Sequence, residues 1–284
     1  MMETVEKIDW MLNQPERWDF SGTENLYAGV DLGTYKTIVI VIDDKGSPRA
    51  ANLRRAEVVK SGLIVDYIRA LDIVRELMDE IRNCSPLKIN KGATSFPPQT
   101  ETANINTTKY ILESVDLEVL SILDEPSAAR LALNIRDGAI VDVGGGTTGV
   151  AVIKDGEVIY TNDEATGGEH LSLVLAGRLN ISYEEADQIK LKKENAQKIL
   201  PIVQPVIEKI SSIVESFLKN FTGIKTIYLA GGTCALDGLS DIVSKNLHIE
   251  TFRPKAPQFI TPFGIALSCL TTDGHQTGAG KWPI

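Results

Sequence analysis

Two segments of the sequence share a pattern in which an apolar strand ends in Asp, one apolar residue and Gly. They are Gly29–Thr34 and Ile140–Thr148; Asp31 and Asp142 lie 111 positions apart, and a second apolar strand follows each turn. A glycine turn exposes backbone N–H groups that can surround an anion, because no Cβ keeps a phosphate away. An Asp just before such a turn can bind a hydrated Mg²⁺. The pattern therefore predicts two half-sites around one polyphosphate.

The second segment is the more specific of the two. It has three consecutive glycines, Gly144, Gly145 and Gly146, directly after a strand. Glycines there lose much conformational entropy and contribute no packing, so close approach of a ligand is the usual compensation. A third glycine turn, Leu229–Thr233, precedes a helix expected over 236–247, whose N-terminus would add positive charge. Each turn alone fits a purely structural role, but the three together favour phosphate binding.

Bulk composition excludes several classes of partner. The chain has 284 residues, a net charge of −9 and a pI of about 5.0, which argues against nucleic acid or an anionic membrane as the main ligand. No apolar run approaches a membrane span, and no signal peptide is recognisable. The three cysteines are scattered, show no metal-ligand spacing with the three histidines, and fit reduced thiols in a cytosol.

Strands and helices alternate along the chain. Residues 5–12 have helical spacing, which predicts a short helix that either folds against the body or docks on a partner. Strands are expected over 26–42, 87–96, 118–123 and 226–230, with a hairpin at 150–160 around an Asp-Gly turn. Helices are expected over 63–81, 100–114, 127–134, 167–178, 182–193, 197–220, 236–247 and from 262.

This alternation predicts an α/β protein made of two duplicated halves, with the glycine turns facing a central cleft. The expected division is an N-terminal extension at 1–25, half I at 26–137 and half II at 138–261. A helix at 262–272 is expected to return to half I. Residues 273–284 are expected to form a disordered tail.

Five segments in order resemble the nucleotide-binding core of the actin, sugar-kinase and DnaK-type chaperone superfamily. The resemblance covers roughly residues 26–270 and implies a duplicated actin-like (ribonuclease H-like) ATPase fold with a central nucleotide cleft. Its segments are two phosphate loops at 29–37 and 140–149, connecting segments at 124–129 and 262–268, and an adenosine segment at 227–238.

Within the superfamily, Leu63–Tyr67 and Gly167–Leu171 look closest to the ethanolamine-utilisation EutJ family. Those chaperone-like proteins are encoded with bacterial ethanolamine-degrading microcompartments. The resemblance implies a cytoplasmic protein, with ethanolamine ammonia-lyase or a microcompartment component as its protein client. It also implies ATP and Mg²⁺ as cofactors.

The resemblance assigns roles to individual residues. Asp31 and Asp142 would bind Mg²⁺ through water, Thr34 and Thr147 would touch phosphates, and Glu125 would orient water or metal. Thr147 would lie near the γ-phosphate position, and the resemblance implies Glu125 and Thr147 as the catalytic residues. Asp187 and Lys190 match positions that face adenosine, and two glycines let the backbone approach base and ribose. The implied cofactor-binding set is Gly33, Thr34, Tyr35, Gly144, Gly145, Gly146, Thr147, Thr148, Asp187, Lys190, Gly231 and Gly232.

The sequence also departs from the DnaK-type pattern. Gly149 replaces an acidic residue, and neither the lysine near the attacking water nor a C-terminal peptide-binding domain is matched. General-base help is worth roughly 10²–10⁴ in rate, so we expect at most a slow ATPase. The expected function is an ATP-binding, chaperone-like accessory protein whose cleft closes on Mg-ATP and changes a partner surface.

Two alternatives remain open at this point. An ATP-dependent actin-like scaffold or filament protein, of the cell-shape or pilus-assembly type, would need a head-to-tail interface. A small-molecule kinase would need larger insertions for a substrate pocket, and this chain has little room for them.

Overall fold

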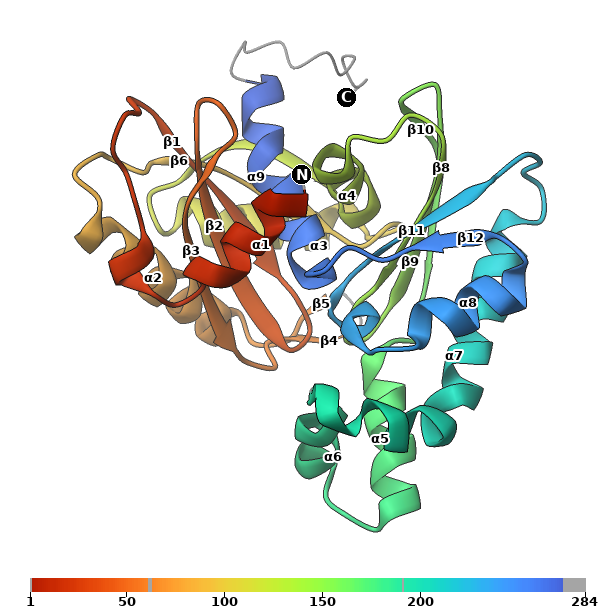
Figure 1. The fold of residues 1–284 in the computed structure, drawn as a ribbon. Coiled ribbons are helices and arrows are strands. Elements are labelled where there is room, and N and C mark those ends of the chain that lie inside the picture. Colours follow the sequence, from red (N-terminus) through yellow and green to blue (C-terminus); the bar gives the residue numbers. More distant parts are fainter. Residues whose placement is uncertain (1, 61–62, 191, 273–284) are drawn as a thin grey trace. The chain divides into compact units, whose positions relative to one another are not determined.

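A computed structural model describes residues 2–60, 63–190 and 192–272 of the chain (Figure 1). The chain forms two compact units, and each is described by itself. Unit 1 runs to Ile135 and resumes at Phe259, and unit 2 is Arg136–Gln258. The observed borders, after Ile135 and Gln258, lie two and three residues before the borders expected after residues 137 and 261. The tail expected to be disordered, 273–284, lies outside the described residues.

Unit 1 is built on a five-stranded sheet with the strand order β3-β2-β1-β6-β7. The pairs β1–β2 and β2–β3 are antiparallel, whereas β1–β6 and β6–β7 are parallel. The edge strand β3 was not expected from the sequence, because it lacks the apolar run that marks its neighbour β2. The strands are β1 (Leu26–Leu32), β2 (Lys36–Asp43), β3 (Pro48–Arg55), β6 (Lys91–Phe96) and β7 (Glu118–Asp124).

One expected helix of unit 1 begins later than the sequence pattern indicated. Helical spacing extends back to Leu63, but Leu63–Ile64 (β5) pairs with Val59–Lys60 (β4). The helix starts after Asp66, whose carboxylate accepts a hydrogen bond from the Arg69 N–H at 3.0 Å and so caps the first turn. The helices of unit 1 are α1 (Met2–Met11), α2 (Tyr67–Cys84), α3 (Thr102–Glu113), α4 (Glu125–Leu133) and α9 (Ile260–Thr272), with a 3₁₀ turn at Pro15–Arg17.

The N-terminal segment folds against its own unit. Val5, Ile8 and Met11 are buried on the inner side of α1, which contacts β3. The Asn13 N–H donates to the Ala51 carbonyl at 3.0 Å, in the edge strand. The segment therefore covers backbone groups that an edge strand would otherwise expose.

Helices α4 and α9 of unit 1 approach each other closely. A Cβ added at Gly264 of α9 would overlap the backbone of Ala128 in α4. Glycine therefore allows the two backbones to meet. These helices carry the two segments that the resemblance identified as connecting segments.

Unit 2 has a five-stranded sheet with the order β10-β9-β8-β11-β12. Its apolar core lies between this sheet and the helices α5 to α8. The strands are β8 (Gly138–Val143), β9 (Thr148–Lys154), β10 (Glu157–Glu164), β11 (Thr226–Ala230) and β12 (Glu250–Phe252). The helices are α5 (Gly168–Leu179), α6 (Tyr183–Lys190), α7 (Ala196–Leu218) and α8 (Leu239–Leu247), with 3₁₀ turns at Lys193–Asn195, Gly232–Ala235 and, at the border with unit 1, Pro257–Phe259.

The two sheets repeat one design. In unit 1 Asp31 pairs with Ile38, and in unit 2 Asp142 pairs with Gly149, which are the same two positions at the offset of 111. Both sheets also have three neighbouring strands joined by antiparallel pairs, with parallel pairs beyond them. The predicted α/β duplication is confirmed.

No helix within 2–60, 63–190 and 192–272 is long and apolar enough to cross a membrane. The longest helix, α7, instead buries one side against the core of unit 2.

Candidate functional site

The glycine turns after β1 and β8 have the same closing hydrogen bond. The N–H of Gly33 donates to the carbonyl of Lys36 at 3.0 Å, and the N–H of Gly144 donates to the carbonyl of Thr147 at 3.0 Å. The residues at the two tips are Thr34 and Tyr35 in unit 1 and Gly145 and Gly146 in unit 2. The two turns, which are 111 positions apart in the sequence, therefore also share the same backbone hydrogen bond.

The carbonyl groups of the second turn are bound to the start of α5. The Gly144 carbonyl accepts the Gly168 N–H at 3.0 Å, and the Gly145 carbonyl accepts the Glu169 N–H at 2.8 Å. In a planar trans peptide the C=O and the following N–H point in opposite directions. The N–H groups of Gly145 and Gly146 therefore point away from α5. Two successive N–H groups aimed to one side are a suitable environment for a phosphate oxygen.

Asp142 lies on the face of its sheet opposite the helices of unit 2. Its neighbours Val141 and Val143 belong to the core beneath those helices, and strand side chains alternate between faces. Asp142 is 7% exposed. Gly231, with φ +88°, packs on it: an added Cβ would overlap an Asp142 carboxylate oxygen and the Val143 carbonyl. Gly231 thus permits a close approach to protein, which the sequence could not distinguish from an approach to a ligand.

The third glycine turn differs from its expected form. The helix predicted from residue 236 begins at Leu239, and a 3₁₀ turn occupies Gly232–Ala235. The prediction was wrong because Gly238, with φ +88°, precedes the helix and interrupts its backbone. Arg253 stabilises the turn by donating to the Ala235 carbonyl at 3.1 Å and to the Asp237 carboxylate at 3.0 Å. The helix N-terminus therefore does not directly follow the glycines.

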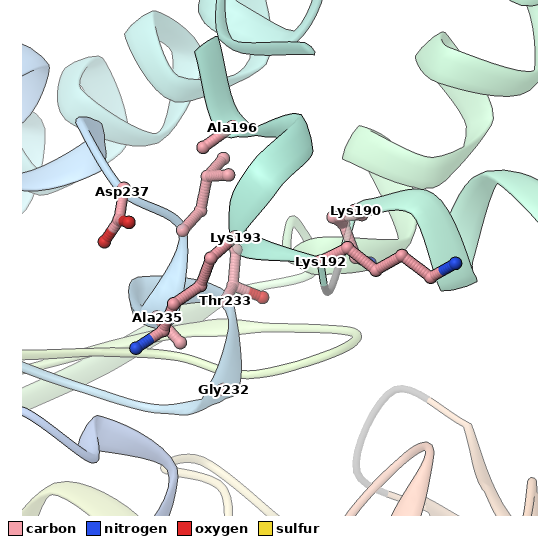
Figure 2. Close-up of a pocket in the computed structure, with 9 residues that line it drawn as sticks. Lys190, Lys192, Lys193, Ala196, Gly232, Thr233, Ala235 and Asp237 are labelled. Atoms are coloured by element: carbon pink, nitrogen blue, oxygen red, sulfur yellow. The ribbon is translucent and has the colours of Figure 1, made fainter. Parts of the chain in front are cut away.

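A pocket of unit 2 lies beside this turn (Figure 2). The cavity itself is small, about 50 Å³, and it continues into open solvent. In Figure 2 the side chain of Lys193 runs from its own turn toward Ala235, and that of Lys192 runs the other way. The lining residues are Lys190, Lys192, Lys193, Ala196, Gly232, Thr233, Ala235, Leu236 and Asp237.

Of the two residues expected to face adenosine, Lys190 lines the pocket and Asp187 is not among the lining residues. The Lys190 ammonium donates to the Gly168 carbonyl at 2.8 Å and the Ser172 hydroxyl at 2.7 Å. It also pairs with the Asp187 carboxylate at 2.8 Å. Both side chains therefore connect α6 to the start of α5, which also binds the glycine turn Gly144–Thr147.

Thr148, expected among the cofactor contacts, is fully buried, and its hydroxyl donates to the Thr166 carbonyl at 2.6 Å. We therefore assign its side chain to the protein interior. The contact was not foreseeable from the sequence, because Thr166 lies 18 residues away. Thr147, by contrast, is half-buried in the turn itself.

Asp124, the residue before Glu125 in unit 1, is a buried capping carboxylate that was not predicted from the sequence. Asp124 ends β7 and caps α4, accepting the Ser127 N–H at 2.9 Å and the Ser127 hydroxyl at 2.6 Å. Burial nevertheless raises the pKa of Asp124 above its ordinary value. Glu125 is the first residue of α4 and is half-buried. The only feature of the sequence that could have pointed to Asp124 is its position next to Glu125.

A second acidic residue was also missed, in unit 2. Gly149 of β9 pairs with Asp142 on one side and with Asp163 of β10 on the other. Burial, with Glu164 nearby, raises the pKa of Asp163. Gly149 occupies the position where DnaK-type chaperones have an acidic residue. In this chain a carboxylate, that of Asp163, lies on the neighbouring strand instead.

The described residues contain no cluster of side chains that could bind a metal ion directly through several ligands. No group of three or more His, Cys, Asp or Glu side chains within 2–60, 63–190 and 192–272 could bind a metal ion. Mg²⁺ commonly keeps several waters and uses one or two carboxylates together with substrate phosphates. Asp142, which lies just before the glycine turn in the chain, fits that mode.

Comparison with known proteins identifies two family models along the chain. The model for type IV pilus assembly protein PilM matches residues 126–258, and the model for MreB/Mbl protein matches residues 49–184. The structure of MreB5 from Spiroplasma citri bound to ADP superposes with a TM-score of 0.69 at 16% identity, covering 84% of this chain and 94% of that chain. This likeness confirms the predicted actin-like ATPase fold.

Closer relatives cover most of the chain. The ethanolamine utilization protein EutJ of Escherichia coli K12 is 41% identical over 245 residues, which are 86% of each sequence. The crystal structure of EutJ from Carboxydothermus hydrogenoformans has a TM-score of 0.87 at 42% identity, covering 94% of this chain and 98% of that chain. The chain therefore belongs to the EutJ family of ethanolamine-utilisation proteins, which has the actin-like ATPase fold.

Proposed function

We propose that this chain binds Mg-ATP, with the turns Gly33–Lys36 and Gly144–Thr147 on the phosphates. The observation that carries the proposal is the pair of peptide groups whose carbonyls bind the start of α5, so that the N–H groups of Gly145 and Gly146 point the other way. The nucleoside would lie at the mouth of the small pocket beside Gly232 and Thr233. A protein of the same fold, MreB5, has been solved with ADP and with AMPPNP, which supports a nucleotide as the ligand.

In this proposal Asp31 and Asp142 bind the hydrated Mg²⁺, one carboxylate from each unit. The ion would supply positive charge to the phosphates. Asp142 has little freedom to move, because Gly231 packs against its carboxylate. Glu125 and Thr147 would orient water and the terminal phosphate.

We further propose that nucleotide binding regulates a chaperone-like accessory role in ethanolamine utilisation. One polyphosphate bound by both turns would close the two units around it and change a surface that a client recognises. A switch between about 1:99 and 99:1 requires roughly 10⁴-fold preference for one arrangement. The client would be ethanolamine ammonia-lyase or a microcompartment component, in the cytoplasm. Hydrolysis would be slow or absent, because Gly149 stands where DnaK-type chaperones have an acidic residue.

Titration calorimetry with Mg-ATP tests the binding proposal. We expect micromolar affinity for the unmodified chain and a loss of at least about tenfold in Asp142→Asn, which replaces a carboxylate proposed to bind the hydrated Mg²⁺ with a neutral amide. Asp155→Asn is the matched control, because Asp155 lies in a hairpin turn at φ 54°, which Asn adopts readily. Equal affinity in all three proteins, or no binding to any of them, would refute the proposed site.

Two further assays separate the roles. Capture of purified ethanolamine ammonia-lyase by the tagged chain should change when Mg-ATP is added, and should lose that change in Asp142→Asn. Pelleting of the chain alone after ATP addition would instead favour the filament alternative.

A further inference from the structure

Thr233 belongs to two features of unit 2 at once. It lines the pocket proposed for the nucleoside, and its hydroxyl donates to the carbonyl of Gly144 at 2.7 Å. The two residues are 89 positions apart in the sequence. Thr233 is only 8% exposed, so this bond lies largely away from competing water.

The same carbonyl accepts a second hydrogen bond. The Gly168 N–H at the start of α5 donates to the Gly144 carbonyl at 3.0 Å. Both lone pairs of this oxygen are therefore used, one by the α5 backbone and one by the Thr233 side chain. Together they fix the plane of the Gly144–Gly145 peptide, and with it the direction of the Gly145 N–H.

The packing around Thr233 leaves little freedom for this bond to change. A Cβ added at Gly168 would overlap the Thr233 hydroxyl, so the helix start and the hydroxyl are in close contact. The Lys190 ammonium donates to the Gly168 carbonyl at 2.8 Å. Arg253 fixes the far end of the 3₁₀ turn through the Ala235 carbonyl. Thr233 therefore connects two segments that are each restrained.

The hydroxyl of Thr233 has one proton, which it uses on Gly144. A ligand that moves Thr233 would also move the Gly144 carbonyl, and the Gly145 N–H with it.

We infer that Thr233 is a positioning residue that couples the nucleoside pocket to the phosphate turn. It acts by fixing the Gly144–Gly145 peptide, so that the Gly145 N–H points toward a bound polyphosphate. This inference rests on the proposed function, since it assigns both features to one nucleotide.

The test compares Thr233→Val, which keeps the shape but removes the donor, with Thr233→Ser, which keeps the donor. Thr251→Val is the matched control, because Thr251 also donates to a backbone carbonyl in unit 2 but lies outside the pocket. Calorimetry measures Mg-ATP and inorganic tripolyphosphate separately. Amide hydrogen exchange measured by NMR reports on Gly145 and Gly146 without ligand.

In Thr233→Val we expect both affinities to fall by about tenfold and exchange at Gly145 to speed up by a similar factor. Thr233→Ser should stay within about threefold of the unmodified chain, and Thr251→Val should not change. A loss for Mg-ATP without a loss for tripolyphosphate, or unchanged exchange at Gly145, would overturn the inference and make Thr233 a nucleoside contact only. If the unmodified chain binds Mg-ATP and Thr233→Val binds it equally, only this inference fails. If the unmodified chain binds neither ligand, the proposed function fails with it.

Discussion

Replacing Gly231 with alanine tests whether this glycine is required by the protein or by a ligand. Gly231 has φ +88°, and an added Cβ would overlap the Asp142 carboxylate and the Val143 carbonyl. Gly156 is the matched control, because its φ is +87° and nothing lies within 4 Å of its added Cβ. The two substitutions share the strain of a positive φ. Gly231→Ala adds the steric contact and, because its ψ is 155°, a backbone conformation almost restricted to glycine.

The magnitude follows from these two components. Forcing alanine into a left-handed conformation costs roughly 1–2 kcal/mol, and the stiffer unfolded chain returns about 0.4–1 kcal/mol. Gly156→Ala should therefore lower the free energy of unfolding by about 1 kcal/mol. Overpacking adds typically 1–3 kcal/mol, so Gly231→Ala should cost about 3 kcal/mol in total.

Urea unfolding of the full chain, followed by circular dichroism, measures the difference. With a slope of about 2 kcal/mol per molar urea, Gly231→Ala should lower the midpoint by about 1.5 M and Gly156→Ala by about 0.5 M. Mg-ATP affinity should fall only in Gly231→Ala, since Asp142 must move. Equal midpoint shifts for the two variants would refute the packing argument. A stable Gly231→Ala protein that has lost only nucleotide affinity would instead assign Gly231 to the ligand.

Three further predictions concern single side chains. Because burial raises the pKa of Asp124, the native state retains a proton that the unfolded state loses, so this group's contribution to stability falls as pH rises from 3.8 through the native pKa. Asp124→Asn keeps the capping oxygen without the charge. Its melting temperature should therefore be higher than that of the unmodified chain at pH 7 and equal to it near pH 4. An increase that does not depend on pH would contradict this. Lys190→Met removes the cation beside Asp187 and should lower the free energy of unfolding by about 2 kcal/mol, with Lys192→Met, which is exposed, near zero. Iodoacetamide at pH 8 should add once by mass spectrometry, at exposed Cys84, because Cys234 and Cys269 are buried and burial together with Asp142 raises the pKa of Cys234. Rapid addition at Cys234 and Cys269 as well would contradict this, because it would show that both units open.

The sequence predicted those parts of the fold that depend on local patterns. The duplicated strand-turn-strand at Asp31 and Asp142 was found by spacing alone, because a glycine turn and its flanking strands are specified within about ten residues. The strand Thr226–Ala230 was expected at its observed bounds for the same reason. The edge strand β3 was missed because its residues alternate less clearly, and pairing with β2 decides its conformation.

The site was predicted less completely, because its contacts join distant segments. The bonds from Thr233 and Gly168 to Gly144 link three parts of unit 2 and have no local signature. The side chain of Thr148 was expected at the ligand and instead binds Thr166. The roles expected for Asp31, Glu125 and Thr147 remain predictions, since they depend on a bound nucleotide.

The central claim is that one Mg-ATP is bound by the glycine turns of both units. Hydrogen exchange of the full chain, with and without Mg-ATP, tests this most directly. We predict slower exchange on ligand addition in both Gly33–Lys36 and Gly144–Thr147, absent in Asp142→Asn. Protection in only one of the two turns, or in neither at saturating Mg-ATP, would contradict the claim.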